Sequence, residues 1–476
     1  MYWHKALNSS FINGKLHQGS DTFTVNNPAN EQLIETLSSV DMAGCQQALD
    51  AAITCFEALK STTAKQRSDV LLKWHSLILE HKQALAELVT LEQGKVLKES
   101  LAEVDYAAGF VKWFADEAHR SYGEIIPANS PTQQLSVIKQ GVGVVFGITP
   151  WNFPLAMITR KVAPAYAAGC SFILKPSEYT PLSALALCQL ALQAGMEAGA
   201  FQTLVTEDAA QLGAFFCEHK QVRKITFTGS TRVGQILLSQ SAQSIKRASL
   251  ELGGNAPFMV FESADIKKAV QGLMVAKFRN AGQTCVAANR VLVQNTCLGE
   301  FLEELKLQTA RLKVADGFTE DADFGPLINT QAKLKAQNLV EDAVAQGAKL
   351  AYQGEEKAGQ FMAPIILTEV KQSMEISRSE IFAPVVAIQT FQDEDQALTM
   401  ANSVDEGLAA YFYSQDIAQV QRVASSLECG MVGINEALIS NPVAPFGGMK
   451  ASGLGREGAK QGLEEYQEVK YLCQSF

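Results

Sequence analysis

The sequence lacks the features typical of proteins that bind nucleic acids, membranes or metal ions. It has no run of basic residues, and its 40 Lys and Arg against 50 Asp and Glu give a net charge of −10, which disfavours a phosphate backbone. Its nine cysteines form no CxxC pair and its six histidines no HExxH motif. The least charged stretches, 140–159 and 179–196, are broken by Pro, Gly or Gln, and the N-terminus has no apolar signal core. We therefore expect no nucleic-acid, membrane or metal partner and a reducing, cytoplasmic location.

The remaining composition is that of an ordinary folded chain, with 47% apolar and 19% charged residues. Residues 41–118 carry apolar side chains at helical spacing. From 142 to about 260, short β-type runs alternate with helical runs, which predicts an α/β fold with a doubly wound parallel sheet. The expected strands are Val142–Ile148, Ser171–Leu174, Phe201–Val205 and Lys224–Thr228, and the expected helices are 155–168, 181–194, 208–218 and 231–241.

A second α/β region is expected after this one, and a hairpin before it. Residues 120–140 contain two β-type runs around a Pro/Asn/Ser turn, which is typical of a hairpin. The second region has expected helices near 264–279, 298–313 and 330–346 and expected strands Val291–Gln294, Val385–Phe391 and Met431–Asn435.

Three motifs lie where predicted strands end, the usual position of ligands in such sheets. Asn152, beside Trp151, has an amide that can donate to a developing oxyanion. Lys175 and Glu178 can hold the hydroxyls of a ribose. Gly229-Ser230 opens a helix whose first N–H groups suit a pyrophosphate. Taken singly, each is explained as well or better by packing glycines, a solvated charge pair or a helix cap.

Two further residues are candidates for chemistry. Glu251 lies among apolar and glycine neighbours, where burial raises a carboxyl pKa and suits it to general-base work. Cys285 follows a helical run and can be a nucleophile if its thiolate is favoured. Alone, a surface glutamate and a small buried cysteine are the commoner explanations.

Together these motifs resemble one family. PWNFP, LKPSEYTP, FTGSTRVG, LELGGNAP, FRNAGQTC, EIFAP and PFGGMKASGLGREG follow one another as they do in NAD(P)-dependent aldehyde dehydrogenases. The stretches AMITRK, KFRNAGQTC and KASGLGREG most resemble the succinate-semialdehyde dehydrogenase branch. The likeness covers essentially the whole chain.

The resemblance implies an aldehyde-dehydrogenase-like fold of three domains. A Rossmann-type cofactor-binding domain is expected from 1–118 and 142–253, and an α/β catalytic domain from 254–450. Segments 119–141 and 451–476 are expected to form a small β-hairpin oligomerisation domain. A homodimer or homotetramer is implied.

Residue roles follow from the same resemblance. The implied catalytic residues are Cys285 as nucleophile, Glu251 as general base and Asn152 as oxyanion donor. The implied cofactor-binding residues are Trp151, Lys175, Glu178, Gly229, Ser230, Leu252 and Glu380. The implied substrate-binding residues, which hold a distal carboxylate, are Arg160, Arg279 and Ser452.

The implied reaction is oxidation of an aldehyde to a carboxylic acid through a cysteine thiohemiacetal and a thioester. Two arginines favour an ω-carboxyl aldehyde, succinate semialdehyde first, with glutarate semialdehyde or an aliphatic aldehyde as alternatives. Glu178 favours NAD over NADP, because a carboxylate accepts from a 2′-hydroxyl and repels a 2′-phosphate. A neutral thiol is a poor nucleophile, so the pKa of Cys285 is expected to be lowered.

Three positions depart from the family pattern. Ala287 stands where branch members often have a second cysteine, so no disulfide switch is expected. Glu207 replaces a common glycine after Phe201–Val205, and Ala383 gives EIFAP in place of EIFGP. A cysteine hydrolase is disfavoured because no histidine motif lies near Cys285, and a non-catalytic binding descendant because all three catalytic residues are present.

Overall fold

The computed structural model describes residues 7–476, so the first six residues of the expected cofactor-binding segment lie outside the described part. Its larger sheet has eight strands in the order β2-β1-β9-β8-β7-β10-β11-β21. The central five run parallel, and the strands at both edges are antiparallel. The strands are β1 Ser10–Ile12, β2 Lys15–His17, β7 Val144–Ile148, β8 Ser171–Lys175, β9 Phe201–Thr203, β10 Val222–Thr228, β11 Arg247–Glu251 and β21 Gly453–Leu454.

Helices connect these parallel strands as the sequence predicts. They are α5 Ala156–Ala167, α6 Pro181–Gln193, α7 Ala209–Glu218 and α8 Thr231–Ser241. Pro181 starts α6 at a position where a missing N–H costs nothing, and Ser230 caps α8 by accepting from the Val233 N–H. The strands of the sheet centre are buried, so their side chains are apolar on both faces.

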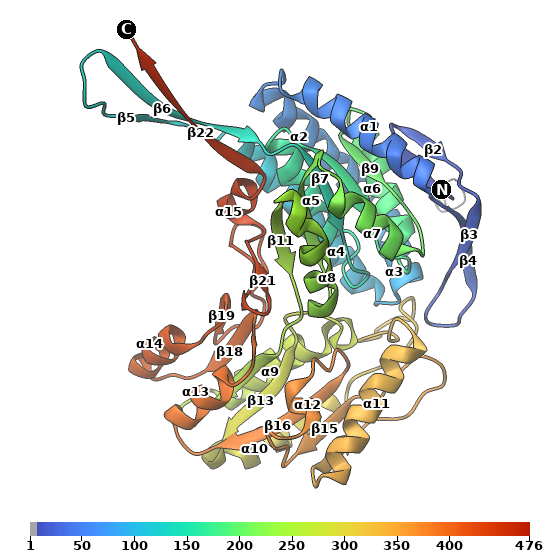
Figure 1. Cartoon of the computed structure of the whole chain (residues 1–476). Helices are drawn as coiled ribbons and strands as arrows, with labels where there is room; N and C mark the ends of the chain where they lie inside the picture. Colours follow the sequence, from blue (N-terminus) through green and yellow to red (C-terminus); the bar gives the residue numbers. More distant parts are fainter. Residues whose placement is uncertain (1–6) are drawn as a thin grey trace.

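The helical segment 41–118 forms four helices that cover this sheet (Figure 1). They are α1 Met42–Leu59, α2 Ala64–Glu80, α3 Lys82–Gln93 and α4 Leu97–Ala118. α4 packs against α2 and α5, and Trp74, Phe110 and Phe114 are fully buried there. A separate hairpin, β3 Asp21–Asn26 and β4 Leu33–Ser39, precedes them.

A second sheet forms the lower half of the molecule in Figure 1, with the order β14-β15-β16-β13-β12-β18-β19. Its strands are β12 Ala256–Val260, β13 Ala288–Gln294, β14 Lys349–Gln353, β15 Ile365–Thr368, β16 Val385–Phe391, β18 Ala409–Tyr413 and β19 Met431–Ile434. Its helices are α9 Ile266–Phe278, α10 Leu298–Thr309, α11 Thr330–Ala345, α12 Glu375–Arg378, α13 Glu394–Asn402 and α14 Ile417–Ser426. A short ladder, β17 Glu406–Gly407 with β20 Met449–Lys450, lies beside it. The predicted α/β fold class is confirmed.

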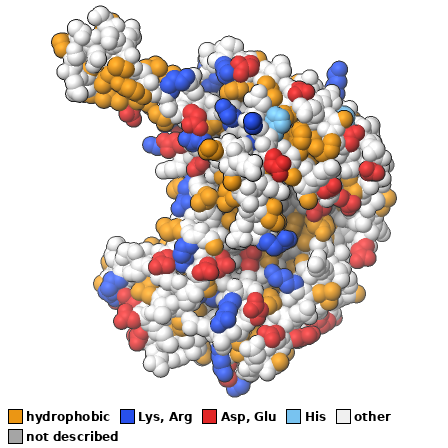
Figure 2. Space-filling model, viewed as in Figure 1, with side chains coloured by type: hydrophobic (Ala, Val, Ile, Leu, Met, Phe, Trp, Pro, Cys, Tyr) orange, Lys and Arg blue, Asp and Glu red, His pale blue; other side chains and the backbone are white. Residues whose placement is uncertain are grey.

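The predicted hairpin is present and projects as an arm (Figure 1). β5 Glu124–Ile126 and β6 Gln133–Gly141 pair with the C-terminal strand β22 Gln467–Ser475, which follows α15 Ala459–Glu464. Figure 2 shows hydrophobic side chains gathered on this arm. Ile125, Val469 and Tyr471 are 72%, 65% and 57% exposed. An exposed apolar sheet of this kind is a surface suited to association.

The carboxyl ends of β7, β10 and β11 point toward the second sheet, so the loops that follow them meet its residues between the two halves. No helix within residues 7–476 is both long and apolar enough to cross a membrane.

Candidate active site

A cavity of about 280 Å³ lies where the two halves meet. It gathers eight of the predicted site residues, namely Trp151, Asn152, Gly229, Ser230, Glu251, Leu252, Cys285 and Glu380. Met157, Lys335 and Phe382 also line it and were not predicted. The Phe382 ring meets the Trp151 ring edge-on, with centroids 5.7 Å apart. The remaining predicted residues, Lys175, Glu178, Arg160, Arg279 and Ser452, do not line this cavity.

Asn152 lies in the loop between β7 and α5 and is fastened to the loop before Cys285. Its Nδ2 donates to the carbonyl oxygen of Gln283 at 3.0 Å. Its own carbonyl oxygen accepts from Asn280 Nδ2 at 3.1 Å. Asn152 is therefore held against the segment that presents the thiol, as an oxyanion donor must be.

The chain before Cys285 has an unusual backbone. Asn280, Ala281 and Gly282 have φ values of 51°, 54° and 79°, so three successive residues are left-handed. A Cβ on Gly282 would lie 2.4 Å from the carbonyl oxygen of Ala383, which only glycine avoids. The side chain of Gln283 pins this loop by donating to the carbonyl oxygens of Asn280 and Pro326 and accepting from the Ile328 N–H. The strained backbone fixes where Cys285 emerges.

The pKa of Cys285 departs from expectation. Burial raises the pKa of the thiol to about 12, and the carboxyl groups of Glu380 and Glu251 add to the rise. The guanidinium groups of Arg160 and Arg279 act in the opposite direction. The predicted lowering is therefore wrong for the protein alone, because loss of water around the sulfur outweighs both cations.

Glu251 ends β11, and its carboxyl group lies deep in the cavity wall. Burial and the negative charge of Glu457 raise the pKa of Glu251 well above the usual carboxyl range. Within residues 7–476 its Oε2 atom has no hydrogen-bond partner. An unpartnered oxygen with a raised pKa suits a base that takes a proton from water.

Behind Glu251 lies a group of buried charges. Glu457 forms ion pairs with both Arg160 and Lys161, and all three side chains are buried. The Arg160 guanidinium stacks on the Phe446 ring, 4.0 Å from its centroid. These cations hold the pKa of Glu457 below its usual value, so Arg160 faces an internal carboxylate rather than open space.

The other two expected substrate residues differ from each other. Ser452 is fully buried, and its Oγ donates to the carbonyl oxygen of Gly253 and accepts from the Gly407 N–H. Its hydroxyl is thus engaged by backbone. Arg279 packs on the Phe153 ring at 5.4 Å and forms no ion pair within the described residues. Arg279 is therefore the guanidinium that remains available to an anion.

A hydroxyl pair next to these arginines was missed by the sequence reasoning. The hydroxyl of Tyr106 on α4 lies near that of Ser440, and the charges of Arg160, Arg279 and Cys285 all act on it. Burial raises the pKa of Tyr106. Nothing in the local pattern around a tyrosine on an amphipathic helix singles it out.

The residues expected to hold a dinucleotide lie at the ends of three neighbouring strands. Gly229 and Ser230 open α8, and Thr228 Oγ1 beside them is buried without a partner among residues 7–476. At the end of β8, Lys175 Nζ lies 2.9 Å from Glu178 Oε2. A helix N-terminus, an unpartnered hydroxyl and a lysine–glutamate pair fit a pyrophosphate and a ribose.

Glu380 crosses to this region from the second half of the chain. It accepts from the Gly254 N–H at 3.2 Å, and Lys335 donates to its carbonyl oxygen at 2.9 Å. Burial raises the pKa of Glu380 to about 7. Its carboxyl group can accept from a ribose hydroxyl at the cavity's inner end.

The three departures have simple structural settings. Ala383 is fully buried and does not have a positive φ, so no glycine is required there. Glu207 is exposed in the loop after β9. All nine cysteines, Cys285 included, are unpaired.

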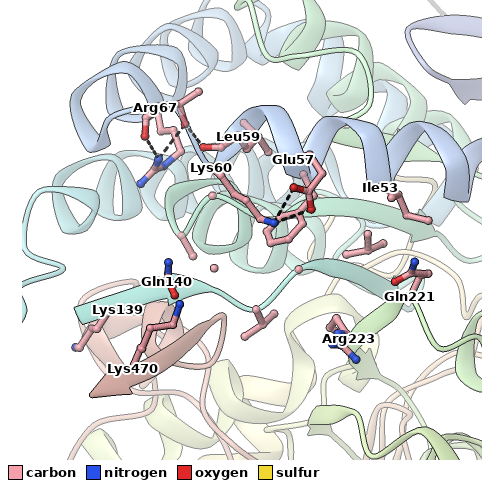
Figure 3. A pocket seen from close by; sticks show the side chains of 18 residues that line it. Ile53, Glu57, Leu59, Lys60, Arg67, Lys139, Gln140, Gln221, Arg223 and Lys470 are labelled. Atoms are coloured by element: carbon pink, nitrogen blue, oxygen red, sulfur yellow. Dashed lines mark hydrogen bonds and ion pairs between the residues drawn. The ribbon is translucent and has the colours of Figure 1, made fainter. Parts of the chain in front are cut away.

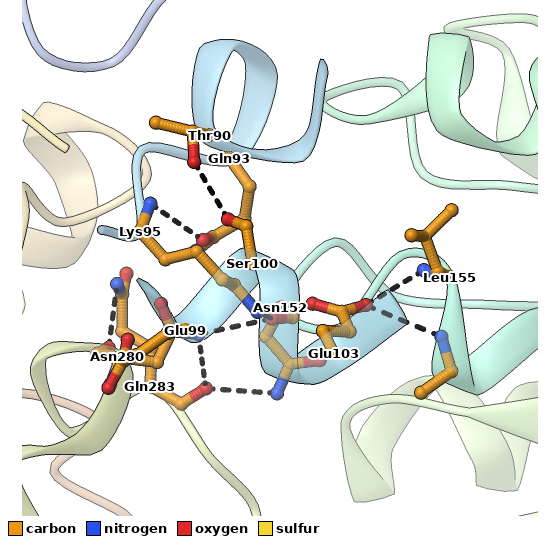
Figure 4. A network of polar contacts seen from close by, with 11 residues as sticks. Thr90, Gln93, Lys95, Glu99, Ser100, Glu103, Asn152, Leu155, Asn280 and Gln283 are labelled. Carbon is orange, nitrogen blue, oxygen red and sulfur yellow. Dashed lines mark hydrogen bonds and ion pairs between the residues drawn. The ribbon is translucent and has the colours of Figure 1, made fainter. Parts of the chain in front are cut away.

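Several buried polar residues around the site were also missed. Lys95 lies just before α4 and Glu99 and Glu103 lie on it, and each reaches the loop of Asn152 or the loop before Cys285 (Figure 4). Glu99 and Glu103 are four residues apart on a largely buried helix and share one face, which is a signal that the sequence did contain; Lys95 precedes the helix and gave no such signal.

Comparison with known proteins identifies the relatives of this chain. Residues 16–472 match the aldehyde dehydrogenase family. The chain is 48% identical over 466 residues to glutarate-semialdehyde dehydrogenase of Pseudomonas putida, covering 98% of this chain and 97% of the relative. It is 47% identical to the NADP(+) succinate-semialdehyde dehydrogenase of Escherichia coli, with 98% and 97% covered. The crystal structure of succinate-semialdehyde dehydrogenase from Burkholderia pseudomallei has a TM-score of 0.97 at 43% identity, with 98% of each chain covered. The chain belongs to the aldehyde dehydrogenase family.

Proposed function

We propose that this enzyme oxidises succinate semialdehyde to succinate with NAD or NADP. The observation that carries the proposal is one cavity holding a thiol, an unpartnered carboxyl group and an amide donor, with Arg279 close enough to act on the thiol. Family membership makes NAD(P)-dependent aldehyde oxidation the general activity.

In the proposed reaction the Cys285 thiolate attacks the aldehyde carbon. The side-chain amide of Asn152 and the N–H of Cys285 hold the resulting oxyanion, each donor contributing about 3–4 kcal/mol in the transition state. The bound dinucleotide supplies the acceptor for the hydride that leaves this carbon. The thioester that remains is hydrolysed by a water from which Glu251 takes a proton, and the acid leaves as the thiol is regenerated.

Because the pKa of Cys285 is raised, Arg160 and Arg279 have a role in the first step of this reaction. Arg160 and Arg279 both favour the thiolate, and both lie near the hydroxyl of Tyr106. An incoming carboxylate on Arg279 would partly neutralise one of them, so substrate chemistry and thiol ionisation are linked.

The substrate class is supported by the cationic surroundings of the thiol. A guanidinium offers planar, bidentate hydrogen bonding to a carboxylate. Of the three residues proposed for the distal carboxylate, Arg279 has no ion-pair partner within residues 7–476, whereas Arg160 pairs with Glu457 and the Ser452 hydroxyl bonds to backbone groups. Glutarate semialdehyde, named for the Pseudomonas putida relative, has the same two functional groups and is the alternative.

Steady-state kinetics over a panel of aldehydes tests the proposal. We expect Arg279→Ala to raise KM for succinate semialdehyde far more than KM for an unbranched aliphatic aldehyde of the same length. Arg311→Ala, a change on the surface after α10, is the control. An equal effect of Arg279→Ala on both substrates would remove the carboxylate assignment, and a lower KM for glutarate semialdehyde would select the alternative.

The dinucleotide preference rests on Glu178. Its side chain is 37% exposed and its partner Lys175 is buried, so the carboxylate is open to solvent and can accept from a ribose 2′-hydroxyl. We propose NAD as the preferred cofactor, with NADP as the alternative that the Escherichia coli relative is named for. Comparing kcat/KM for both dinucleotides decides between them, and Glu178→Gln is expected to shift the ratio toward NADP.

The domain assignment and assembly are proposed on the same footing. The cofactor-binding segments would be 1–118 and 142–253, the catalytic segment 254–450, and the oligomerisation segments 119–141 and 451–476. The exposed apolar arm supports a homodimer or homotetramer, and the nine unpaired cysteines support a cytoplasmic setting. Light scattering of the intact protein measures the assembly.

A further inference from the structure

Lys95 is a fully buried lysine that contacts the backbone of Asn152. It follows Gly94, whose φ of 90° turns the chain between α3 and α4 where a Cβ would meet the rings of Pro28 and Pro326. The Lys95 side chain has no exposed surface. Its Nζ atom donates to the carbonyl oxygen of Asn152 at 2.7 Å and to Glu103 Oε2 at 2.6 Å (Figure 4).

The third face of the ammonium group is also occupied. Lys95 Nζ lies 3.8 Å from the centroid of the Phe153 ring, the residue after Asn152. An ammonium group removed from water is costly unless its donors are satisfied. Apart from its bond to Glu103, Lys95 Nζ contacts the loop of Asn152, through the Asn152 carbonyl oxygen and the Phe153 ring. These contacts offset the free-energy cost of removing the ammonium group from water.

Glu103 holds the other end of the same loop. Its Oε1 accepts from the Leu155 N–H at 2.8 Å and the Ala156 N–H at 3.3 Å. These N–H groups begin α5, which has no side-chain cap of its own. The buried Lys95–Glu103 pair thus hydrogen-bonds to the backbone on both sides of Phe153 and fixes the path of residues 152–156.

We propose that Lys95, with Glu103, is a positioning residue that sets the oxyanion donor Asn152. This inference rests on the proposed role of Asn152. Removing an oxyanion donor costs about 10²–10³-fold in kcat, and a displacement of about 1 Å can cost about 10²-fold. Releasing the Asn152 carbonyl from Lys95 leaves only the Asn280 amide on that oxygen.

The test is a double-mutant cycle between Lys95→Met and Asn152→Ala. Lys95→Met is expected to lower kcat and the rate of the first NADH burst by about 10²-fold, with KM for the aldehyde and Kd for NAD nearly unchanged. In the Asn152→Ala background the same change should have almost no further effect. Lys82→Met, which breaks the more exposed pair between Lys82 of α3 and Asp105 of α4, is the matched control.

Additive effects in the cycle, or a folded Lys95→Met enzyme with wild-type turnover, would overturn the proposal. If Lys95→Met does not fold, Glu103→Gln keeps the shape of the side chain and is expected to give the same loss of burst rate. An enzyme that oxidises no aldehyde with either dinucleotide would instead refute the proposed function, so the two failures are distinguishable.

A different cavity carries a second inference. It has a volume of about 670 Å³ and lies at the amino ends of β7 and β10, the opposite end of the sheet from the active site (Figure 3). Five cationic side chains line it together with one acidic side chain, Glu57; the cations are Lys60, Arg67, Lys139, Arg223 and Lys470.

Two of the five cations are already paired. Lys60 pairs with Glu57 at 2.6 Å and Lys139 with Glu464 at 3.3 Å. Among the described residues, Arg67 donates only to neutral oxygens, those of Ala167 and Thr62. Arg223 and Lys470 form no ion pair within residues 7–476. Three positive charges therefore remain uncompensated around one cavity of an acidic protein.

A glycine in the wall of this cavity lets the Arg223 side chain pack closely against the backbone. Gly143 has a φ of 133°, and a Cβ there would lie 2.8 Å from Arg223 Cγ. We infer that the cavity binds a small anion with several negative charges, of the pyrophosphate class. Its volume lies within the range of about 300–1,000 Å³ usual for small-molecule sites.

Calorimetry with inorganic pyrophosphate tests this inference, in saturating NAD to fill the dinucleotide site and at ionic strength held constant with KCl. We expect binding, and at least a tenfold loss of affinity in the double variant Arg223→Gln/Lys470→Gln. Lys267→Gln/Lys268→Gln on α9 removes the same charge elsewhere and should leave affinity unchanged. No binding, or an equal loss in both double variants, would overturn the inference.

Discussion

The two walls of the active-site cavity are built on different principles. The thiol wall, Cys285 and Asn152 with residues 279–284 behind them, is held by amide hydrogen bonds and by three left-handed residues. The carboxyl wall, Glu251 with Arg160, Lys161 and Glu457 behind it, is held by buried charges. The first fixes positions, because backbone strain and amides do not respond to pH. The second sets a proton affinity, because each of its charges acts on Glu251.

The difference matches what each wall has to do. A nucleophile and its oxyanion donors must be placed within a fraction of an ångström. A base must have a pKa near the working pH, which only its electrostatic surroundings can supply. We expect mutations of the thiol wall to act through geometry and those of the carboxyl wall through charge.

The largest effect is expected from Glu251→Gln. Removing the base should lower steady-state turnover by about 10²–10⁴-fold, while one equivalent of NADH still forms per active site because thioester formation precedes hydrolysis. Stopped-flow absorbance of NADH separates the two. Loss of the burst in parallel with turnover would show that Glu251 is needed before the thioester forms.

Glu457→Gln tests the carboxyl wall by removing one of its buried charges. It leaves Arg160 and Lys161 buried without a carboxylate, which should cost about 3–5 kcal/mol in the free energy of unfolding. Glu464→Gln, whose side chain is 40% exposed and pairs with Lys139, should cost under about 1 kcal/mol. Urea denaturation measures both, and similar losses would contradict the charge-based account.

Gly282→Ala tests the thiol wall by disturbing the backbone before Cys285. The added Cβ meets the carbonyl oxygen of Ala383 and the φ of 79° disfavours alanine, so about 1–3 kcal/mol of stability should be lost. Gly299→Ala in α10 has open space and should stabilise by about 0.5–1 kcal/mol. If Gly282→Ala keeps full stability and turnover, backbone strain does not set the thiol.

The smallest effect concerns the pKa of the Cys285 thiol, on which charges of both walls act. Because burial raises the pKa of Cys285 to about 12, the thiolate fraction is small near neutrality and should grow as pH rises. Without cofactor, iodoacetamide labelling of Cys285 should increase with pH and show no plateau below pH of about 9. Mass spectrometry follows it, with exposed Cys473 as internal reference for the reagent. A plateau at lower pH would restore the original expectation of a lowered thiol pKa.

Most of the elements followed from local pattern. The alternation after residue 142 predicted β7, β8, β9 and β10 within a few residues, because strand and helix periodicities are properties of neighbouring side chains. The edge strands β1, β2 and β21 were not predicted, and neither was the inner strand β11; β21 is two residues long and exists only through its pairing with β11. Pairing between distant segments leaves little mark on either one.

The sequence by itself determined which chemical groups are present and that they belong to one family, because residue types and their order are read directly from the chain. Only the tertiary structure decided what surrounds each group. It joined Lys161 to Glu457 across 296 positions, placed Lys95 on the carbonyl of Asn152, and buried Cys285 enough to raise its pKa. Proton affinity and donor geometry depend on distance and access to water, and both are set by contacts between residues far apart in sequence.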